Sequence, residues 1–141
     1  MRNEQGFTAM EDMTLLLVAV FAFTVFFASV VGAYVTREKR ARGEALQADA
    51  DAFLEAVGAD ARWTAGRGMF LADALNETTA KDLLPLAAGR PFILVVRDLA
   101  TDDRWSFGGG SSGDRRVAVT SANVVADGVH PARVTATVWE S

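Results

Sequence analysis

The sequence predicts an α+β protein with one long N-terminal helix and a small antiparallel sheet of about four strands. Three observations predict this fold. An uncharged apolar run extends from Met13 to Val35, a helical stripe of apolar residues follows it, and alternating apolar residues occupy the chain from Pro91 onward. The first half of the helix is expected to be transmembrane, and the second half to be amphipathic and to pack on the sheet.

The apolar run from Met13 to Val35 is rich in Leu, Val, Phe and Ala. A helix rises about 1.5 Å per residue, so this run is long enough to cross a hydrocarbon core of roughly 30 Å. We therefore expect a transmembrane helix over residues 7–35. The rest of the chain has an ordinary soluble composition and is expected to form one small domain.

Composition excludes several classes of function. The chain has no cysteine, which rules out disulfides, thiolate metal sites and cysteine nucleophiles. Its formal net charge of -4 argues against a nucleic-acid partner, because phosphate recognition needs a clustered basic face. The basic residues that do cluster, between Arg37 and Arg42, directly follow the apolar run, where cations typically contact lipid headgroups.

A short motif stands before the apolar run. Residues 6–11 read GFTAME, and the apolar stretch follows this motif, whereas an ordinary secretory signal places its apolar stretch before the cleavage site. The motif resembles the class III signal of type IV prepilins, in which a peptidase cleaves after glycine. On these residues the chain is similar to type IV pilin-like and pseudopilin proteins.

The resemblance implies a role for each residue of the motif. Residues 1–6 would be the leader, Gly6 and Phe7 would flank the processing site, and Glu11 would be the glutamate on which assembly depends. The implied partners are other pilin-like subunits, the membrane, a prepilin peptidase and its assembly machinery. No cofactor is implied, and the acidic balance and absence of cysteine suit an archaeal-type pilus subunit.

Chemistry gives Glu11 a reason to stand where it does. A carboxylate four residues after Phe7 lies on the same face of a helix. It could pair with the ammonium that cleavage creates on Phe7, in the same subunit or a neighbour, and so offset the cost of burying both charges. The alternative is that Glu11 and Asp12 are first-turn acids favoured by the helix dipole.

Two signals disagree about the orientation of the chain. The flank after the apolar run is more basic than the flank before it, so the positive-inside rule alone would place the C-terminal domain in the cytoplasm. The prepilin-like motif implies an extracytoplasmic domain. Because several features coincide in the motif, we adopt the extracytoplasmic orientation, at the cell membrane or in a surface filament.

The helix is expected to continue over residues 36–57, which contain no proline and a single glycine, Gly43. A 3.6-residue apolar stripe runs along it, formed by Leu46, Ala50, Phe53, Leu54 and Val57. The opposite side carries Gln47, Asp49, Asp51 and Glu55. Such a half-exposed stripe predicts packing against a sheet.

The small domain is expected to cover residues 58–141. Gly58 is predicted to end the long helix, and a short helix is expected near Met69 to Leu75. Asn76, Glu77 and Thr78 form an N-glycosylation sequon, which makes Asn76 a candidate surface site, with an unmodified loop as the alternative.

Strand patterns fill the rest of the chain. The segments PFILVVRDL, Arg104 to Phe107, RRVAVTSANVVAD and ARVTATVW alternate or bury apolar residues between turns, and antiparallel hairpins follow most simply. The turn at Asp127 and Gly128 joins the last two. Gly108 to Gly113 reads as a flexible loop, because it lacks the lysine of a P-loop.

Few residues could support catalysis. His130 is the only histidine, it is expected in a turn before Pro131, and the acids have no metal-loop spacing, so neither an enzyme nor a metal site is predicted. Two hypotheses remain. The chain is a structural subunit of a type IV pilus-like filament or pseudopilus, or it is a single-pass membrane adaptor or ligand-binding module that does not polymerise.

Overall fold

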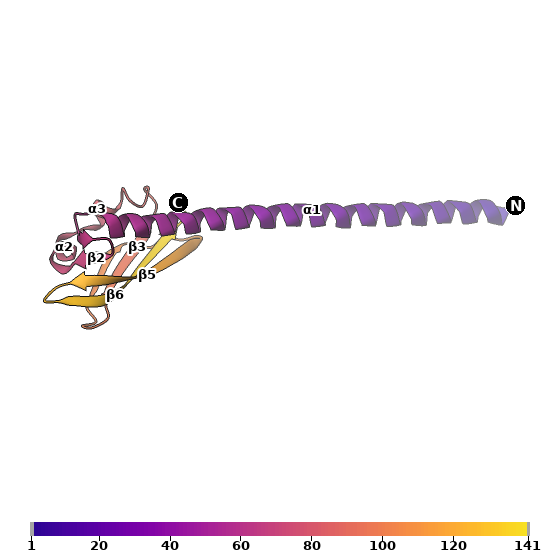
Figure 1. The fold of residues 1–141 in the computed structure, drawn as a ribbon. Coiled ribbons are helices and arrows are strands. Elements are labelled where there is room, and N and C mark those ends of the chain that lie inside the picture. Colours follow the sequence, from indigo (N-terminus) through magenta and orange to yellow (C-terminus); the bar gives the residue numbers. More distant parts are fainter. Residues whose placement is uncertain (1, 141) are drawn as a thin grey trace. The chain divides into compact units, whose positions relative to one another are not determined.

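The structure, a computed structural model, describes the backbone of residues 2–140 and the side chains of residues 10–140. It is α+β, as expected (Figure 1). The elements follow in the order α1 (Arg2–Ala59), β1 (Thr64–Gly66), β2 (Met69–Leu71), α2 (Ala72–Glu77), α3 (Ala80–Leu83), β3 (Phe92–Asp98), β4 (Arg104–Gly108), β5 (Arg115–Val125) and β6 (Val129–Trp139).

The chain divides into two compact units, residues 1–41 and residues 42–141. The first unit is the N-terminal part of α1 and contains the apolar run. The second unit contains the C-terminal part of α1 together with the two short helices and the sheet.

The second unit has two layers, with the C-terminal part of α1 along one face of the sheet (Figure 1). The predicted stripe is confirmed, since all five of its residues are buried in the single core cluster. The ring of Phe53 lies 5.0 Å from the ring of Phe92 on β3, which joins helix to sheet. Burying the stripe stabilises a helix whose opposite side remains exposed to water.

The sheet has six strands in the order β1-β2-β5-β6-β3-β4. The expectation of about four antiparallel strands therefore identified the four long ones and missed two. β1 and β2 contain three residues each, too few for an alternating pattern to show. β2 pairs with β5 in parallel, so the sheet is mixed and not purely antiparallel.

The two longest strands, β5 and β6, form one hairpin that pairs along its whole length. Its turn lies at Asp127 and Gly128, as the sequence predicts. Every second residue of β6 from Ala132 to Val138 is buried on the face that meets α1; these residues are Ala132, Val134, Ala136 and Val138. The other face of the sheet is more exposed, with Val117 and Val119 among the large apolar residues that remain accessible.

The segment between α1 and β3 differs from the expectation. The predicted helix near Met69 to Leu75 is wrong in its first half, because Met69–Leu71 is a strand and the helix runs over Ala72–Glu77. Leu71 pairs with Val125, and its backbone N–H donates to the carbonyl of Trp63. These long-range partners override the local helical preference.

Gly43 has a packing role that sequence reasoning did not anticipate. A Cβ at this position would lie 2.4 Å from a guanidinium nitrogen of Arg116, on β5. The glycine therefore lets the Arg116 side chain rest against the backbone of α1. Glycine has a low helix propensity, but a larger residue at this position would displace the arginine side chain.

Candidate functional site

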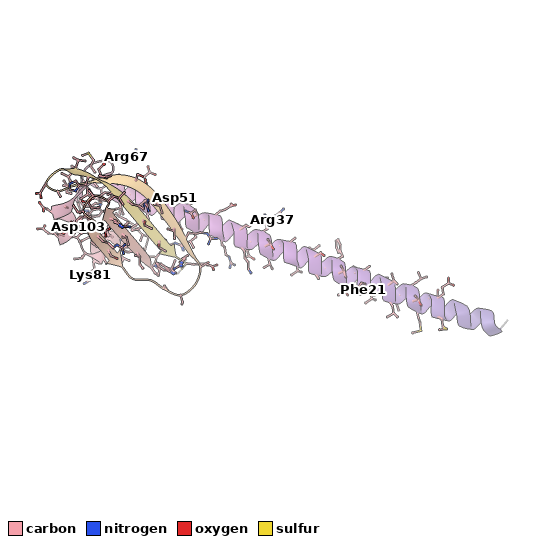
Figure 2. All side chains as sticks on the ribbon, turned by 90° about the horizontal axis from the view of Figure 1, so that it is seen from below. Phe21, Arg37, Asp51, Arg67, Lys81 and Asp103 are labelled. Atoms are coloured by element: carbon pink, nitrogen blue, oxygen red, sulfur yellow. The ribbon has the colours of Figure 1, made fainter. Side chains whose placement is uncertain are left out.

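The most extensive chemically distinctive surface is the apolar part of α1. Within the described residues, α1 is the one helix long and apolar enough, by length and composition, to cross a membrane. Its large side chains are exposed; they include Met13, Leu15, Leu16, Leu17, Val18, Val20, Phe21, Phe23, Val25, Phe26, Phe27, Val30, Val31, Tyr34 and Val35. Phe21, labelled on the helix in Figure 2, is one of the most exposed of them.

The threonine and serine hydroxyls between Met10 and Thr36 are satisfied by the helix itself. Thr14, Thr24, Ser29 and Thr36 each donate a hydrogen bond of 2.8 to 2.9 Å to the carbonyl oxygen four residues earlier. In an apolar solvent an unpaired hydroxyl would cost several kcal/mol, roughly 4 to 8 on transfer to cyclohexane. These four hydroxyl groups therefore carry no unpaired hydrogen at the surface, which suits lipid or a neighbouring helix.

The predicted processing and assembly residues lie at the N-terminal end of α1. Gly6 and Phe7 are within the helical backbone, but they lie outside the residues whose side chains the structure describes. The side chain of Glu11 is described and exposed. One further acid, Asp12, separates it from the uncharged run that begins at Met13.

Asn76, the candidate glycosylation site, lies in the last turn of α2 and is exposed. Its side-chain oxygen accepts a hydrogen bond of 2.7 Å from the indole nitrogen of Trp105, on β4. The Thr78 hydroxyl of the sequon donates to the carbonyl of Ala74. Asn76 thus links α2 to β4, a structural role that the sequon did not suggest.

A buried aspartate and its histidine partner form the most organised polar cluster in the domain. Asp98, at the end of β3, is only 1% exposed, and its Oδ2 lies 2.7 Å from Nδ1 of His130. The backbone N–H groups of Ala100 and Thr101 donate to the other carboxylate oxygen. The expectation that His130 lies in a turn is wrong: it lies on β6, opposite Val124 of β5.

The surroundings of Asp98 determine whether its carboxyl group is ionised and which side chain carries the shared proton. Burial raises the pKa of the Asp98 carboxyl, but hydrogen bonds from His130, Ala100 and Thr101 lower it by more, so the net pKa lies below its ordinary value of 3.8. The carboxylate is therefore ionised at neutral pH. Because an ionised carboxylate only accepts hydrogen bonds, the proton of the shared bond is on Nδ1 of His130.

The pair borders a cleft of about 480 Å³ that also contains Asp73, Asn76 and Asp127. Within the described part of the chain, no group accepts or donates a hydrogen bond at Nε2 of His130, and no three acidic or histidine side chains are placed to hold a metal ion. The pair acts as a clamp that holds the turn after β3 against β6.

The signal for this clamp was present in the sequence. In the strand FILVVRD, buried residues alternate at Phe92, Leu94 and Val96, and the same alternation places Asp98 on the buried face. A buried aspartate needs partners, and His130 is the single histidine of the chain. Sequence reasoning treated the two residues separately and so missed the pair.

Substitution of Asp98 by asparagine is expected to lower the unfolding temperature by several degrees at pH 7. Asparagine cannot form the charge-assisted hydrogen bonds, and its amide N–H₂ group would face other hydrogen-bond donors. The pKa of Asp98 is lower in the folded than in the unfolded chain. Its carboxylate therefore stabilises the fold fully when the pH is above the ordinary pKa, and this stabilisation is lost as the pH falls through the folded-state pKa. The difference from wild type should therefore shrink below about pH 4. Thermal unfolding of the full-length protein in detergent, followed against pH, measures both effects.

The control for this substitution is Asp103→Asn, which changes an exposed acid on the same turn. It should leave the unfolding temperature close to that of wild type. Equal effects of the two substitutions at pH 7 would contradict the clamp.

Comparison with known proteins adds no assignment: no protein-family model, curated protein or solved structure matches the chain.

Proposed function

We propose that the chain is a structural subunit, major or minor, of a type IV pilus-like filament or pseudopilus, held in the membrane through α1 before assembly. One observation carries this proposal. The exposed, uncharged face of α1 from Met13 to Val35 stands directly behind the motif GFTAME and continues as the same helix into a folded α+β domain.

The exposed apolar surface supports an environment other than water. Large apolar side chains occupy all sides of the helix between Met13 and Val35, and a surface of this size in water would drive aggregation. Lipid covers this apolar surface before assembly, and neighbouring helices cover it afterwards. Small residues such as Ala19, Ala22 and Gly32 allow such helices to approach closely.

The proposed orientation places residues 42–141 outside the cytoplasm. In that orientation the exposed Asn76 faces the compartment where glycosylation of sequons takes place. The basic residues between Arg37 and Arg42 would then lie near the outer headgroups, where they can also meet acids of neighbouring subunits.

The same basic flank favours a second candidate, a single-pass adaptor or ligand-binding module with a cytoplasmic domain that does not polymerise. It shares the anchor helix with the first candidate but needs neither processing after Gly6 nor a carboxylate at residue 11. Glu11 therefore separates the two candidates.

Replacement of Glu11 by alanine is expected to leave membrane insertion intact and to reduce the yield of sheared filaments by about tenfold or more, because the Phe7 ammonium would be buried without a partner. The yields of the membrane fraction and of sheared filaments, from a host with its prepilin peptidase and assembly machinery, measure the two effects.

The matched control is Asp12→Ala, which removes the adjacent exposed acid. It does not share a helix face with Phe7 at the four-residue spacing, so filament yield should stay near that of wild type. Equal filament yield from Glu11→Ala and wild type would favour the adaptor.

A further inference from the structure

Strand β5 has an edge that the rest of the domain leaves largely unpaired. β5 pairs with β6 along its whole length, but on its other side β2 pairs only with Asn123, Val124 and Val125. Within the described residues, the part of β5 from Arg115 to Ala122 therefore has no strand on the side away from β6.

Two hydrogen bonds identify the groups that face this edge. The carbonyl of Val117 accepts from the side chain of Gln47, and the N–H of Asn123 donates to the carbonyl of Gly68. Both partners lie on the side away from β6. Since strand geometry repeats every two residues, the backbone groups of Val119 and Ser121 point to the same side.

These intervening groups are almost without partners. In the described part of the chain, the Ser121 carbonyl has one long contact of 3.4 Å with the Thr120 hydroxyl, and no backbone hydrogen bond reaches Val119 from this side. Unpaired edges of this kind accept a further strand, from the same or another chain.

A cavity of about 470 Å³ lies beside the edge and leaves room for such a strand. Its lining includes Val119 and Ser121 from β5, Asp51 and Leu54 from α1, and Arg67 from the turn between β1 and β2. Asp51 and Arg67 are marked in Figure 2 on the domain. On the helix side of this space, Asp51 is exposed, and within the described residues its carboxylate accepts a hydrogen bond from Gln47 alone, whereas Glu55 is paired with Arg67.

The strand at the opposite edge of the sheet has the length and the free edge needed to pair with β5 of another copy. β4 is the outermost strand and pairs only with β3, so its other edge is free in the described structure. Its five residues are fewer than those of the open stretch of β5.

Strand direction makes the two edges compatible in copies that share one orientation. β5 is antiparallel to β6, β6 to β3, and β3 to β4, so β4 runs opposite to β5. When one copy is displaced sideways without turning over, its β4 meets the β5 edge of the next copy antiparallel.

We propose that β4 of one copy pairs with the free edge of β5, from Arg115 to Ala122, in a second copy, and so extends the sheet from copy to copy. The contact joins two different surfaces, so it does not close on itself and generates a row of subunits. This inference deepens the proposed function, on which it rests, by naming a contact between the domains of neighbouring subunits.

The absence of cysteine from the chain allows a direct test by disulfide trapping. Ser106, Val95, Thr135 and Val119 are paired across four adjacent strands, so Ser106 and Val119 lie on one face of the sheet. Full-length Ser106→Cys is co-expressed with Val117→Cys, Val119→Cys or Ser121→Cys, which share that face and sample three registers. Membranes are then oxidised with copper phenanthroline.

At least one of these three combinations is expected to give mixed disulfide dimers, about tenfold above the combination with Thr120→Cys, because a disulfide needs Cα atoms about 4.4 to 6.8 Å apart. Thr120 is also exposed on β5 but faces the other side of the sheet, so it is the matched control. A double variant that carries Ser106→Cys and the best β5 cysteine should give a ladder of oligomers.

Three results would overturn the edge contact. These are efficient trapping through Thr120→Cys, disulfides of a β5 cysteine variant with itself that exceed the mixed ones, and no trapping in any register. If trapping fails in a chain that is processed after Gly6 and forms filaments, the edge contact is wrong and the filament function stands. Mixed disulfides in a chain that retains residues 1–6 support the contact and count against the filament function.

Discussion

Replacement of Phe53 by alanine is expected to remove about 3 to 5 kcal/mol from the free energy of unfolding of the domain. The Phe53 side chain is 1% exposed and its ring packs on that of Phe92, so the substitution leaves a cavity between α1 and β3. A domain of this size has a total stability of about 5 to 15 kcal/mol, so the loss is a large share of it.

Denaturant unfolding of the full-length protein in detergent measures this effect through tryptophan fluorescence. All three tryptophans, Trp63, Trp105 and Trp139, lie in the second unit, so the signal reports that unit alone. The matched control is Phe23→Ala, the same change on the same helix at a position where the side chain is 65% exposed. Equal destabilisation by both would contradict the packing of α1 on the sheet.

Replacement of Gly6 by isoleucine is expected to abolish removal of the leader, because a branched side chain next to the scissile bond hinders the peptidase. The protein should still enter the membrane through α1, but the Phe7 ammonium would not form and Glu11 would lose its proposed partner. Filaments should then be absent. A control substitution, Asn3→Ala, changes the leader at a distance from the bond and should be processed normally.

The long-range architecture could be predicted where residues repeat with a clear period. The stripe from Leu46 to Val57 gave the packing face of α1, and the alternation from Phe92 to Val96 gave β3, because burial of one face imposes the period. β1 and β2 could not be predicted. They are too short to show a period, and β2 is a strand because β5 pairs with it.

The candidate functional residues also differ in how far they could be predicted from the sequence. The motif around Gly6 and Glu11 is local, so the sequence alone suggests its role. The Asp98 and His130 clamp and the open edge of β5 depend on which strands are neighbours, since their residues are far apart in the chain. The hydrogen bond between Asn76 and Trp105 could not be predicted from the sequence for the same reason, because it joins a short helix to an edge strand.

The intact mass of the protein purified from a host with its own prepilin peptidase tests the central claim most directly. A pilin-like subunit is processed after Gly6 before it assembles, so the account predicts a chain that begins at Phe7 and lacks the mass of residues 1–6. A chain that still begins at Met1 or Arg2 in such a host would contradict the filament function and favour the membrane adaptor.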